Sequence, residues 1–126
     1  MKFIILLFLS FSSIGIFAQT DTVKTYFPNG NLEAAVVYEK DVRQGEAIFY
    51  WENGNVKEKR NYVNDKVFGT VSTYYENGNL KELFSIEDGK RDGPAAYYDS
   101  TGEVTDDVMF ENGVRKGQEF LLVGEY

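Results

Sequence analysis

Glycine recurs at a fixed interval along this chain, and the interval constrains the fold more than any other feature. Two series share a period of 24 residues, namely Gly30, Gly54, Gly78 and Gly102, and Gly45, Gly69, Gly93 and Gly117. The chain is therefore one short unit repeated four times. Such units stack on their neighbours, so the period predicts an elongated array rather than a globule around one core.

The first glycine series predicts tight β-hairpin turns. Asn-Gly stands between aromatic and aliphatic residues in three units, and Thr101-Gly102 takes its place in the fourth. Asn-Gly is typical of a two-residue type I′ turn, in which both residues have positive φ. This geometry would place Trp51 opposite Val56. A three-residue bulged turn would instead shift the pairing and exchange the two faces of the sheet.

The second glycine series predicts a wider turn that joins one hairpin to the next. Units three and four carry Gly-x-x-x-Gly here, whereas Asp41 and Asp65 replace the first glycine in units one and two. Asp is among the few non-glycine residues that accept positive φ. We therefore expect the same turn in all four units.

These patterns predict an all-β fold, an antiparallel β-hairpin repeat array that forms a single-layer twisted meander of about four 24-residue repeats. The repeats would span approximately 22–45, 46–69, 70–93 and 94–117, followed by a terminal strand within 118–126. The expected strands are 23–27, 32–38, 46–51, 56–62, 70–75, 80–86, 95–99, 104–110 and 118–123.

Alternation of side chains along the strands predicts one better-buried face. Its expected members are Phe27, Trp51, Tyr75, Leu32, Val56, Leu80, Val104, Ala47, Val71, Ala95, Phe84 and Val108, with Tyr38, Tyr62, Ile86 and Phe110 at its far edge. The opposite face would carry the tyrosines that precede the turns, together with Glu33, Lys57, Lys81 and Thr105.

The first 18 residues have the layout of a secretory signal peptide. Met1-Lys2 gives a short positive start, residues 3–17 are nearly all apolar, and Ala18 precedes a polar stretch. The apolar stretch is shorter than the roughly 20 residues that a spanning helix needs. We therefore expect cleavage after Ala18, a repeat domain over residues 19–126, and export to the periplasm, cell surface or extracellular space.

Charge and residue types argue against several kinds of function. The formal net charge is −7, and removing residues 1–18 takes away one Lys and makes it −8. An acidic chain without a basic cluster is not suited to nucleic acid or to an anionic membrane surface. The chain has neither Cys nor His, which argues against a disulfide framework, a typical transition-metal site and a cofactor.

The repeated aromatic residues are the candidate binding site. Aromatic rings can stack on a glycan or attract a cation, and they can equally serve to pack adjacent strands together. Lys57 and Lys81 would lie beside Tyr50 and Tyr74 and cover their rings. The candidate binding residues are Tyr26, Tyr50, Tyr74, Tyr98, Trp51 and Tyr75.

Acidic residues also recur in register, at Glu58, Glu82 and Asp106 on the better-buried face. Positions on adjacent hairpins would be about 10 Å apart, whereas a retaining glycosidase pair lies about 5–5.5 Å apart. With no His or Cys to assist, we expect solvated carboxylates or a pair with Arg60, and no enzymatic activity.

The motif from Tyr74 to Glu82, followed by Glu87 to Gly93, resembles the variant MORN repeat (membrane occupation and recognition nexus). Bacterial proteins with this variant are often labelled antitoxin-like. The resemblance covers residues 26 to about 123. It implies an elongated twisted hairpin array and a role in protein–protein contact or scaffolding, with membrane apposition in some eukaryotic members. Unit four departs from the motif, because Asp99 replaces the second aromatic residue and Thr101 replaces Asn.

Together these features predict an exported non-enzymatic repeat module that mediates protein–protein binding or scaffolding. The alternative is a carbohydrate- or cell-wall-binding module of aromatic hairpin repeats. An open strand near 118–123 could also pair with a partner strand or with another copy of the chain.

Overall fold

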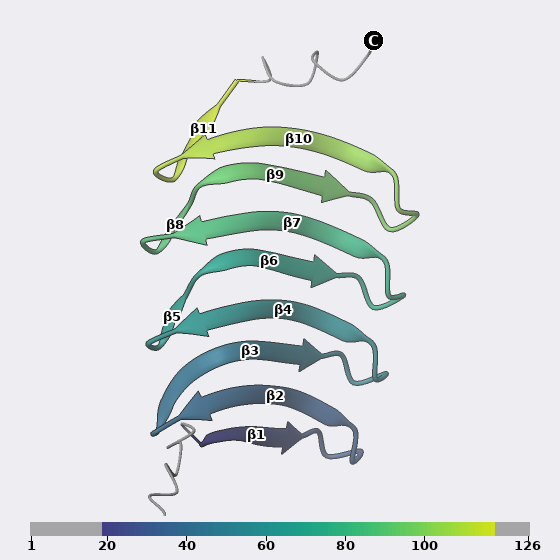
Figure 1. The fold of residues 1–126 in the computed structure, drawn as a ribbon. Helices are drawn as coiled ribbons and strands as arrows, with labels where there is room; N and C mark the ends of the chain where they lie inside the picture. The colour runs from purple at the N-terminus through teal and green to yellow at the C-terminus, as the bar shows by residue number, and fades with distance from the viewer. Residues whose placement is uncertain (1–18, 118–126) are drawn as a thin grey trace, which may run out of the picture.

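The structure is a computed structural model that describes residues 19–117. The predicted signal peptide (1–18) and the predicted terminal strand (118–126) lie outside this range. The described residues contain no helix and form one antiparallel sheet (Figure 1). The all-β hairpin array is therefore confirmed.

Strands follow one another along the chain in the manner of a meander. Their spatial order is β1-β2-β3-β4-β6-β7-β9-β10-β11, with β5 paired to β4 and β8 paired to β7. The bounds are β1 (Thr20–Tyr26), β2 (Leu32–Glu39), β3 (Val42–Tyr50), β4 (Val56–Val63), β5 (Lys66–Val67), β6 (Gly69–Tyr74), β7 (Leu80–Glu87), β8 (Lys90–Arg91), β9 (Gly93–Tyr98), β10 (Val104–Glu111) and β11 (Val114–Lys116).

The Asn-Gly turns have three residues, so the predicted two-residue type I′ geometry is wrong. In unit two the Trp51 N–H donates to the Asn55 carbonyl at 2.8 Å, and the Gly54 N–H donates to the Trp51 carbonyl at 2.9 Å. Gly54 has a φ of 92°, whereas Asn53 is not among the residues with positive φ. Asn53 Oδ1 accepts the Asn55 N–H at 2.9 Å, a local bond that favours this turn.

The extra turn residue changes the cross-strand register. Tyr50 pairs with Val56, and a bulge then brings Phe49 opposite Glu58. The predicted pairing of Trp51 with Val56 is therefore wrong, and the bulged alternative holds. The same shift occurs in the other units, where Tyr26, Tyr74 and Tyr98 pair with Leu32, Leu80 and Val104.

The turns that join one hairpin to the next have two residues. A wider turn was predicted at these positions, and that prediction is wrong. Both central residues have positive φ, as type I′ requires. They are Lys40-Asp41 (48° and 64°), Asn64-Asp65 (49° and 66°), Asp88-Gly89 (50° and 75°) and Asn112-Gly113 (49° and 81°). The expectation that Asp41 and Asp65 take the glycine's conformation is confirmed. Because these turns are tight, the chain pairs again at once, which creates the unpredicted short strands β5, β8 and β11.

Three members of the second glycine series, Gly45, Gly69 and Gly93, lie where the sheet register shifts just after a two-residue turn. Tyr62 pairs with Val67 but Lys59 pairs with Ser72, so the chain between Val67 and Ser72 holds two residues more than the strand opposite it. Gly69 lies in this shift with a φ of 78°, which glycine adopts without steric cost. Figure 1 shows the resulting offset between β5 and β6, and likewise between β8 and β9.

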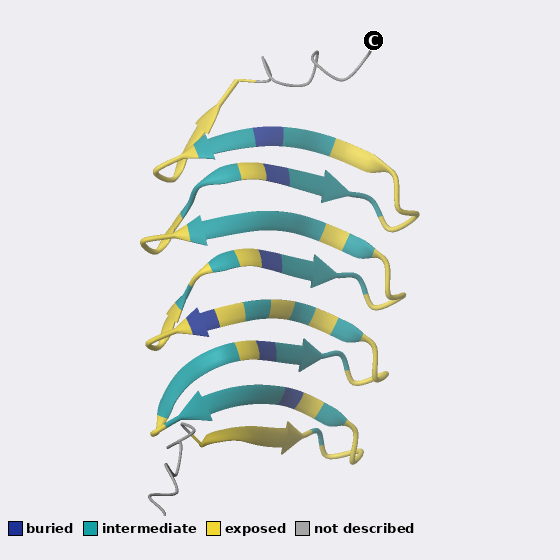
Figure 2. Cartoon of the chain, viewed as in Figure 1, coloured by how far each residue is buried: buried dark blue, intermediate teal, exposed yellow. Residues whose placement is uncertain are grey.

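One face of the sheet holds every buried residue among those described, and we call it the buried face. In Figure 2 the buried residues are the dark segments on β2, β3, β4, β6, β9 and β10. They are Ala34, Ala47, Tyr62, Val71, Ala95 and Val108. The central part of the predicted buried face is therefore confirmed. The tyrosines that precede the turns share the opposite face with Leu32, Val56, Leu80 and Val104, so grouping these four with Phe27, Trp51 and Tyr75 was wrong.

Candidate binding site

The predicted tyrosine ladder lies on the opposite face and packs across strand pairs. Tyr26, on the edge strand, is 59% exposed, whereas Tyr50, Tyr74 and Tyr98 are half-buried. Each ring stands opposite an aliphatic side chain, an arrangement that stabilises adjacent strands. A role for the ladder in binding stays a prediction.

Trp51 and Tyr75 connect consecutive hairpins. Trp51 Nε1 donates to the Tyr74 carbonyl at 3.2 Å, and the Tyr75 hydroxyl donates to the Tyr98 carbonyl at 2.8 Å. Lys57 Nζ lies 4.7 Å from the centre of the Trp51 ring, so the expectation that Lys57 covers Tyr50 is wrong. The structure does gather Phe27, Tyr50 and Trp51 around a shallow hollow of about 440 Å³.

Asparagine side chains join the three-residue turns in series. In unit two, Asn53 and Asn55 both donate through Nδ2 to the Glu76 carbonyl of unit three, at 2.8 and 2.7 Å. The same pair of bonds runs from unit one to Glu52 and from unit three to Ser100. We call this series of bonds the asparagine ladder. Its donors always belong to the earlier unit, so the ladder has a direction.

On the buried face, arginines pair with the recurring carboxylates. Arg91 Nη2 lies 3.3 Å from Glu82 Oε1, and its guanidinium stacks 3.9 Å from the centre of the Phe84 ring. In unit four, Arg115 Nη2 lies 2.6 Å from Asp106 Oδ2. The carboxylates are thus held in ion pairs.

Unit two departs from this arrangement, because Val67 stands where units three and four have arginine. Arg60 takes over the pairing, and its Nε lies 2.7 Å from Glu58 Oε1. The expected pair of Glu58 with Arg60 is therefore confirmed. The contact is ionic, because Arg60 Nε is buried and makes no hydrogen bond in the described part of the chain. The space that an arginine side chain at position 67 would fill is therefore empty of such a side chain.

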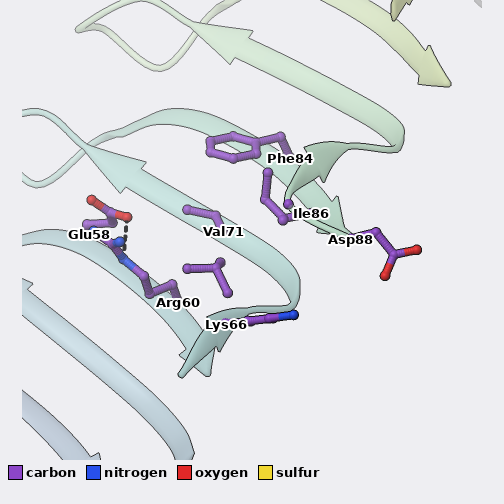
Figure 3. Close-up of a pocket in the computed structure, with 9 residues that line it drawn as sticks. Glu58, Arg60, Lys66, Val71, Phe84, Ile86 and Asp88 are labelled. Carbon is purple, nitrogen blue, oxygen red and sulfur yellow. Dashed lines mark ion pairs between the residues drawn. The ribbon is translucent and has the colours of Figure 1, made fainter. Parts of the chain in front are cut away.

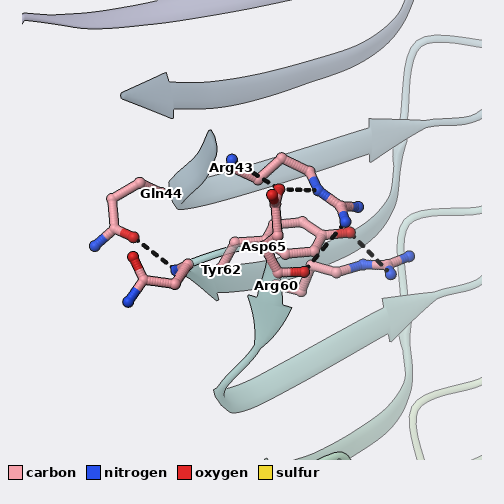
Figure 4. Close-up of polar contacts among 6 residues, drawn as sticks. Arg43, Gln44, Arg60, Tyr62 and Asp65 are labelled. Carbon is pink, nitrogen blue, oxygen red and sulfur yellow. Dashed lines mark hydrogen bonds and ion pairs between the residues drawn. The ribbon is translucent and has the colours of Figure 1, made fainter. Parts of the chain in front are cut away.

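Hydrogen bonds tie the two-residue turn of unit one to that of unit two (Figure 4). The Asp65 N–H donates to the Arg43 carbonyl at 3.0 Å, and the Asn64 N–H donates to Gln44 Oε1 at 2.8 Å. Asp65 Oδ1 in turn accepts the Arg43 N–H at 2.9 Å and Arg43 Nε–H at 3.0 Å. The pKa of Asp65 is held below its ordinary value mainly by the hydrogen bond from the Arg43 backbone, and next by the bond from the Arg43 side chain.

The same two links join the turns of units three and four. The Gly113 N–H donates to the Arg91 carbonyl at 2.8 Å, and the Asn112 N–H donates to Asp92 Oδ1 at 3.2 Å. Both junctions therefore use one backbone carbonyl and one side-chain acceptor at equivalent positions.

Within residues 19–117, the junction between units two and three makes neither of these links. The groups that correspond to the donors of the two links are the N–H groups of Asp88 and Gly89. Those that correspond to the acceptors are the Val67 carbonyl and the side chain of residue 68. That side chain is Phe68, which has no acceptor and is 53% exposed. The two turns are consequently not hydrogen-bonded to each other.

A groove of about 640 Å³ opens at this junction, and we call it the turn groove (Figure 3). Its floor is apolar, made by Val67, Val71, Phe84 and Ile86. Figure 3 shows Glu58 and Arg60 on one side of this floor and Asp88 on the other. The complete lining is Glu58, Arg60, Lys66, Val67, Val71, Phe84, Ile86, Asp88 and Gly89.

Sequence reasoning missed the turn groove, although an internal comparison of the units contains its signal. Residues 63, 67 and 68 are Val, Val and Phe in unit two. The other units carry Glu at the first position, Arg at the second, and Gln, Asp or Lys at the third. Apolar residues therefore replace charged or polar ones at three neighbouring positions, and Val63 is 43% exposed.

The described residues offer no cluster of three or more Asp, Glu, His or Cys side chains that could hold a metal ion. Among residues 19–117 there is also no helix with the length and hydrophobicity to cross a membrane.

An open sheet of stacked hairpins, with a groove between two units, defines a β-hairpin repeat protein. The model of the MORN repeat variant matches the chain three times, at residues 22–40, 43–64 and 69–88. The chain belongs to this family, whose repeats are generally non-catalytic modules that bind proteins or membranes. Unit four lies beyond the matched residues and nevertheless forms the same hairpin. A search of curated proteins finds no match to this chain.

Proposed function

We propose that this protein is an exported, non-enzymatic repeat module that binds another protein. The observation that carries the proposal is the turn groove, a concave apolar site on an otherwise regular sheet, with charged side chains at its margins. Its volume falls in the range of about 300–1,000 Å³ that is usual for ligand sites.

The links between units favour binding by a preformed surface. The asparagine ladder fixes each unit against its neighbour, and the ties between two-residue turns add to it at the junctions of units one and two and of units three and four. A rigid surface loses little conformational entropy when it binds, so more of the contact energy contributes to affinity. Export is supported by the signal-peptide layout of residues 1–18.

Crosslinking in intact cells, followed by purification of the tagged protein, tests this function. We expect one envelope or secreted protein to be recovered in a constant ratio to the tagged chain. Recovery of the tagged protein alone, or only from the cytosol, would contradict the proposal.

Carbohydrate binding is the second candidate, and the hollow formed by Phe27, Tyr50 and Trp51 favours it. Aromatic rings beside Glu52 and Glu76 suit a glycan or a quaternary ammonium group. Titration of Trp51 fluorescence with soluble glycans and with choline distinguishes the two functions. A saturable response would support this candidate, and an unchanged spectrum would eliminate it.

A further inference from the structure

We infer that the turn groove binds an extended segment of a protein chain, which pairs through its backbone with the unlinked turns of units two and three. The inference rests on the proposed function and specifies its site and the form of its ligand.

Backbone groups at the junction lack the partners that they have elsewhere in the array. The N–H groups of Asp88 and Gly89 and the carbonyl of Val67 occupy positions that are hydrogen-bonded at both other junctions. In the described chain these groups lack those bonds. Free N–H and C=O groups beside a sheet are the elements that an extended chain uses when it adds to a β-structure.

The floor of the turn groove offers an apolar surface that no side chain of the repeat covers as Arg91 does in unit three. Arg91 fills the equivalent space in unit three, where it stacks on Phe84 and reaches Glu82. Val67 is too short to do so, and its apolar surface remains half-buried together with Ile86. An aliphatic or aromatic side chain of the ligand would cover this surface, and burial of apolar area is the main source of affinity at such a site.

The residues in which unit two differs from the other units compensate for one another. Loss of the arginine at position 67 would leave Glu58 unpaired, yet Arg60 stands where the other units have an apolar residue and pairs with it. The charge is thus compensated within the unit while the space stays open. Phe68 and Val63, both exposed, extend the apolar surface from the groove to the other side of the hairpin.

The polar margin selects the kind of ligand. Lys66 and Asp88 place charges of opposite sign at the groove, and the chain as a whole is acidic. An anionic lipid surface or a nucleic acid would meet net repulsion here. A peptide segment with alternating apolar side chains satisfies both the floor and the unpaired backbone groups.

Selection from a library of random linear peptides tests the inference on the purified protein. We expect enrichment of sequences with aliphatic or aromatic residues at alternate positions. The double variant Val67→Arg, Phe68→Gln restores the residue types of the other junctions and should bind the selected peptides at least about tenfold more weakly. Val23→Arg, which makes the same change at an exposed position of β1, is the matched control and should bind as the wild type does.

Amide hydrogen exchange supplies a second measurement. The Gly89 amide should become protected when a selected peptide binds, and it should also be protected in the double variant without peptide. Three outcomes would overturn the inference: no enriched peptide, equal binding by the double variant, or unchanged exchange at Gly89 in the complex. If the cellular partner is nevertheless recovered with the double variant, protein binding stands and the turn groove is not its site.

Discussion

Asp65 shows how a single side chain can organise a junction between repeats. Its carboxylate accepts hydrogen bonds from the backbone and the side chain of Arg43, and its own N–H donates to the Arg43 carbonyl. The hydrogen bonds to Asp65 also raise the pKa of the Arg43 guanidinium. Aspartate can serve here because its backbone tolerates the positive φ of 66° that the turn requires.

Stability should decrease in acid partly because of Asp65. Its folded-state pKa is lowered by the hydrogen bonds from Arg43, so the unfolded chain takes up the proton first as the pH falls. The contribution is therefore complete above about pH 4 and is lost as the pH falls through the folded-state pKa. Urea unfolding at a series of pH values should show a smaller acid dependence for Asp65→Asn than for the wild type. Identical dependence in both proteins would contradict this role.

Gly54 provides a test of the three-residue turn. Its φ of 92° is unfavourable for any residue with a Cβ, although a Cβ there would meet no neighbouring atom within 4 Å. Gly54→Ala should therefore cost about 1 kcal/mol through the backbone alone. Gly54→Asn is the control and should cost less, because Asn tolerates this conformation better. Equal losses of free energy of unfolding would show that steric contacts, rather than φ, decide the effect.

At the scale of elements, the repeat spacing predicts the strands well and the turns poorly. Eight of the nine expected strands correspond to β1, β2, β3, β4, β6, β7, β9 and β10, and the ninth lies beyond the described residues. The repeated turn sequences mark where these strands end, and the aromatic and aliphatic residues beside each turn favour extended chain between them. Asn-Gly, in contrast, fits both a two-residue and a three-residue turn. The choice depends on whether the Asn53 side chain accepts the Asn55 N–H, and the sequence pattern alone does not decide whether this bond forms.

The candidate site was harder to predict than the strands. Tyr50 and Trp51 do line a hollow, as an aromatic binding site would. The turn groove, however, depends on hydrogen bonds that are absent between Gly89 and Val67 although equivalent residues make them elsewhere. Such a difference follows from the three-dimensional alignment of turns in adjacent units, which requires the correct turn lengths.

The asparagine ladder should contribute measurably to the pairing of units two and three. Asn55→Ala removes the bond from Nδ2 to the Glu76 carbonyl and should destabilise the protein by about 1 kcal/mol. Thr101→Ala in unit four serves as a comparison, because Thr101 bonds only to Asp99 within its own turn. Chemical denaturation of both variants gives the two values, and a larger loss for Thr101→Ala would contradict the role of the ladder between units.

At the scale of the whole molecule, the sheet has no second layer in the described range, and each hairpin contacts mainly its neighbours. Stability in such an array depends on the units and on the interfaces between them. The interface between units two and three keeps the asparagine and Trp51 links on one side and lacks the links between two-residue turns on the other. We therefore expect this side of the junction to open more often than the equivalent regions.

Hydrogen exchange of the protein without ligand measures this difference. The Gly89 amide should exchange faster than the equivalent Asp65 and Gly113 amides, which are hydrogen-bonded to carbonyls of the preceding unit. Trp51 should be unaffected by the difference, because its N–H lies in an intact three-residue turn. Similar protection at all three turn positions would show that the junction is closed by other contacts.

Unit four accepts the asparagine ladder from unit three and does not extend it. Asp99 takes the place of Trp51 and Tyr75, and its Oδ1 accepts the N–H groups of Thr101 and Glu103 at 2.9 and 3.1 Å. We therefore expect that the array is lengthened more favourably in the middle than at this end. A copy of residues 70–93 inserted after Gly93 would find matching acceptors and donors and add two strands, or about 10 Å, to the molecule. Duplication of unit four would instead leave the added hairpin without an asparagine donor from the preceding turn, so we expect that junction to be weaker than the one inside the lengthened array.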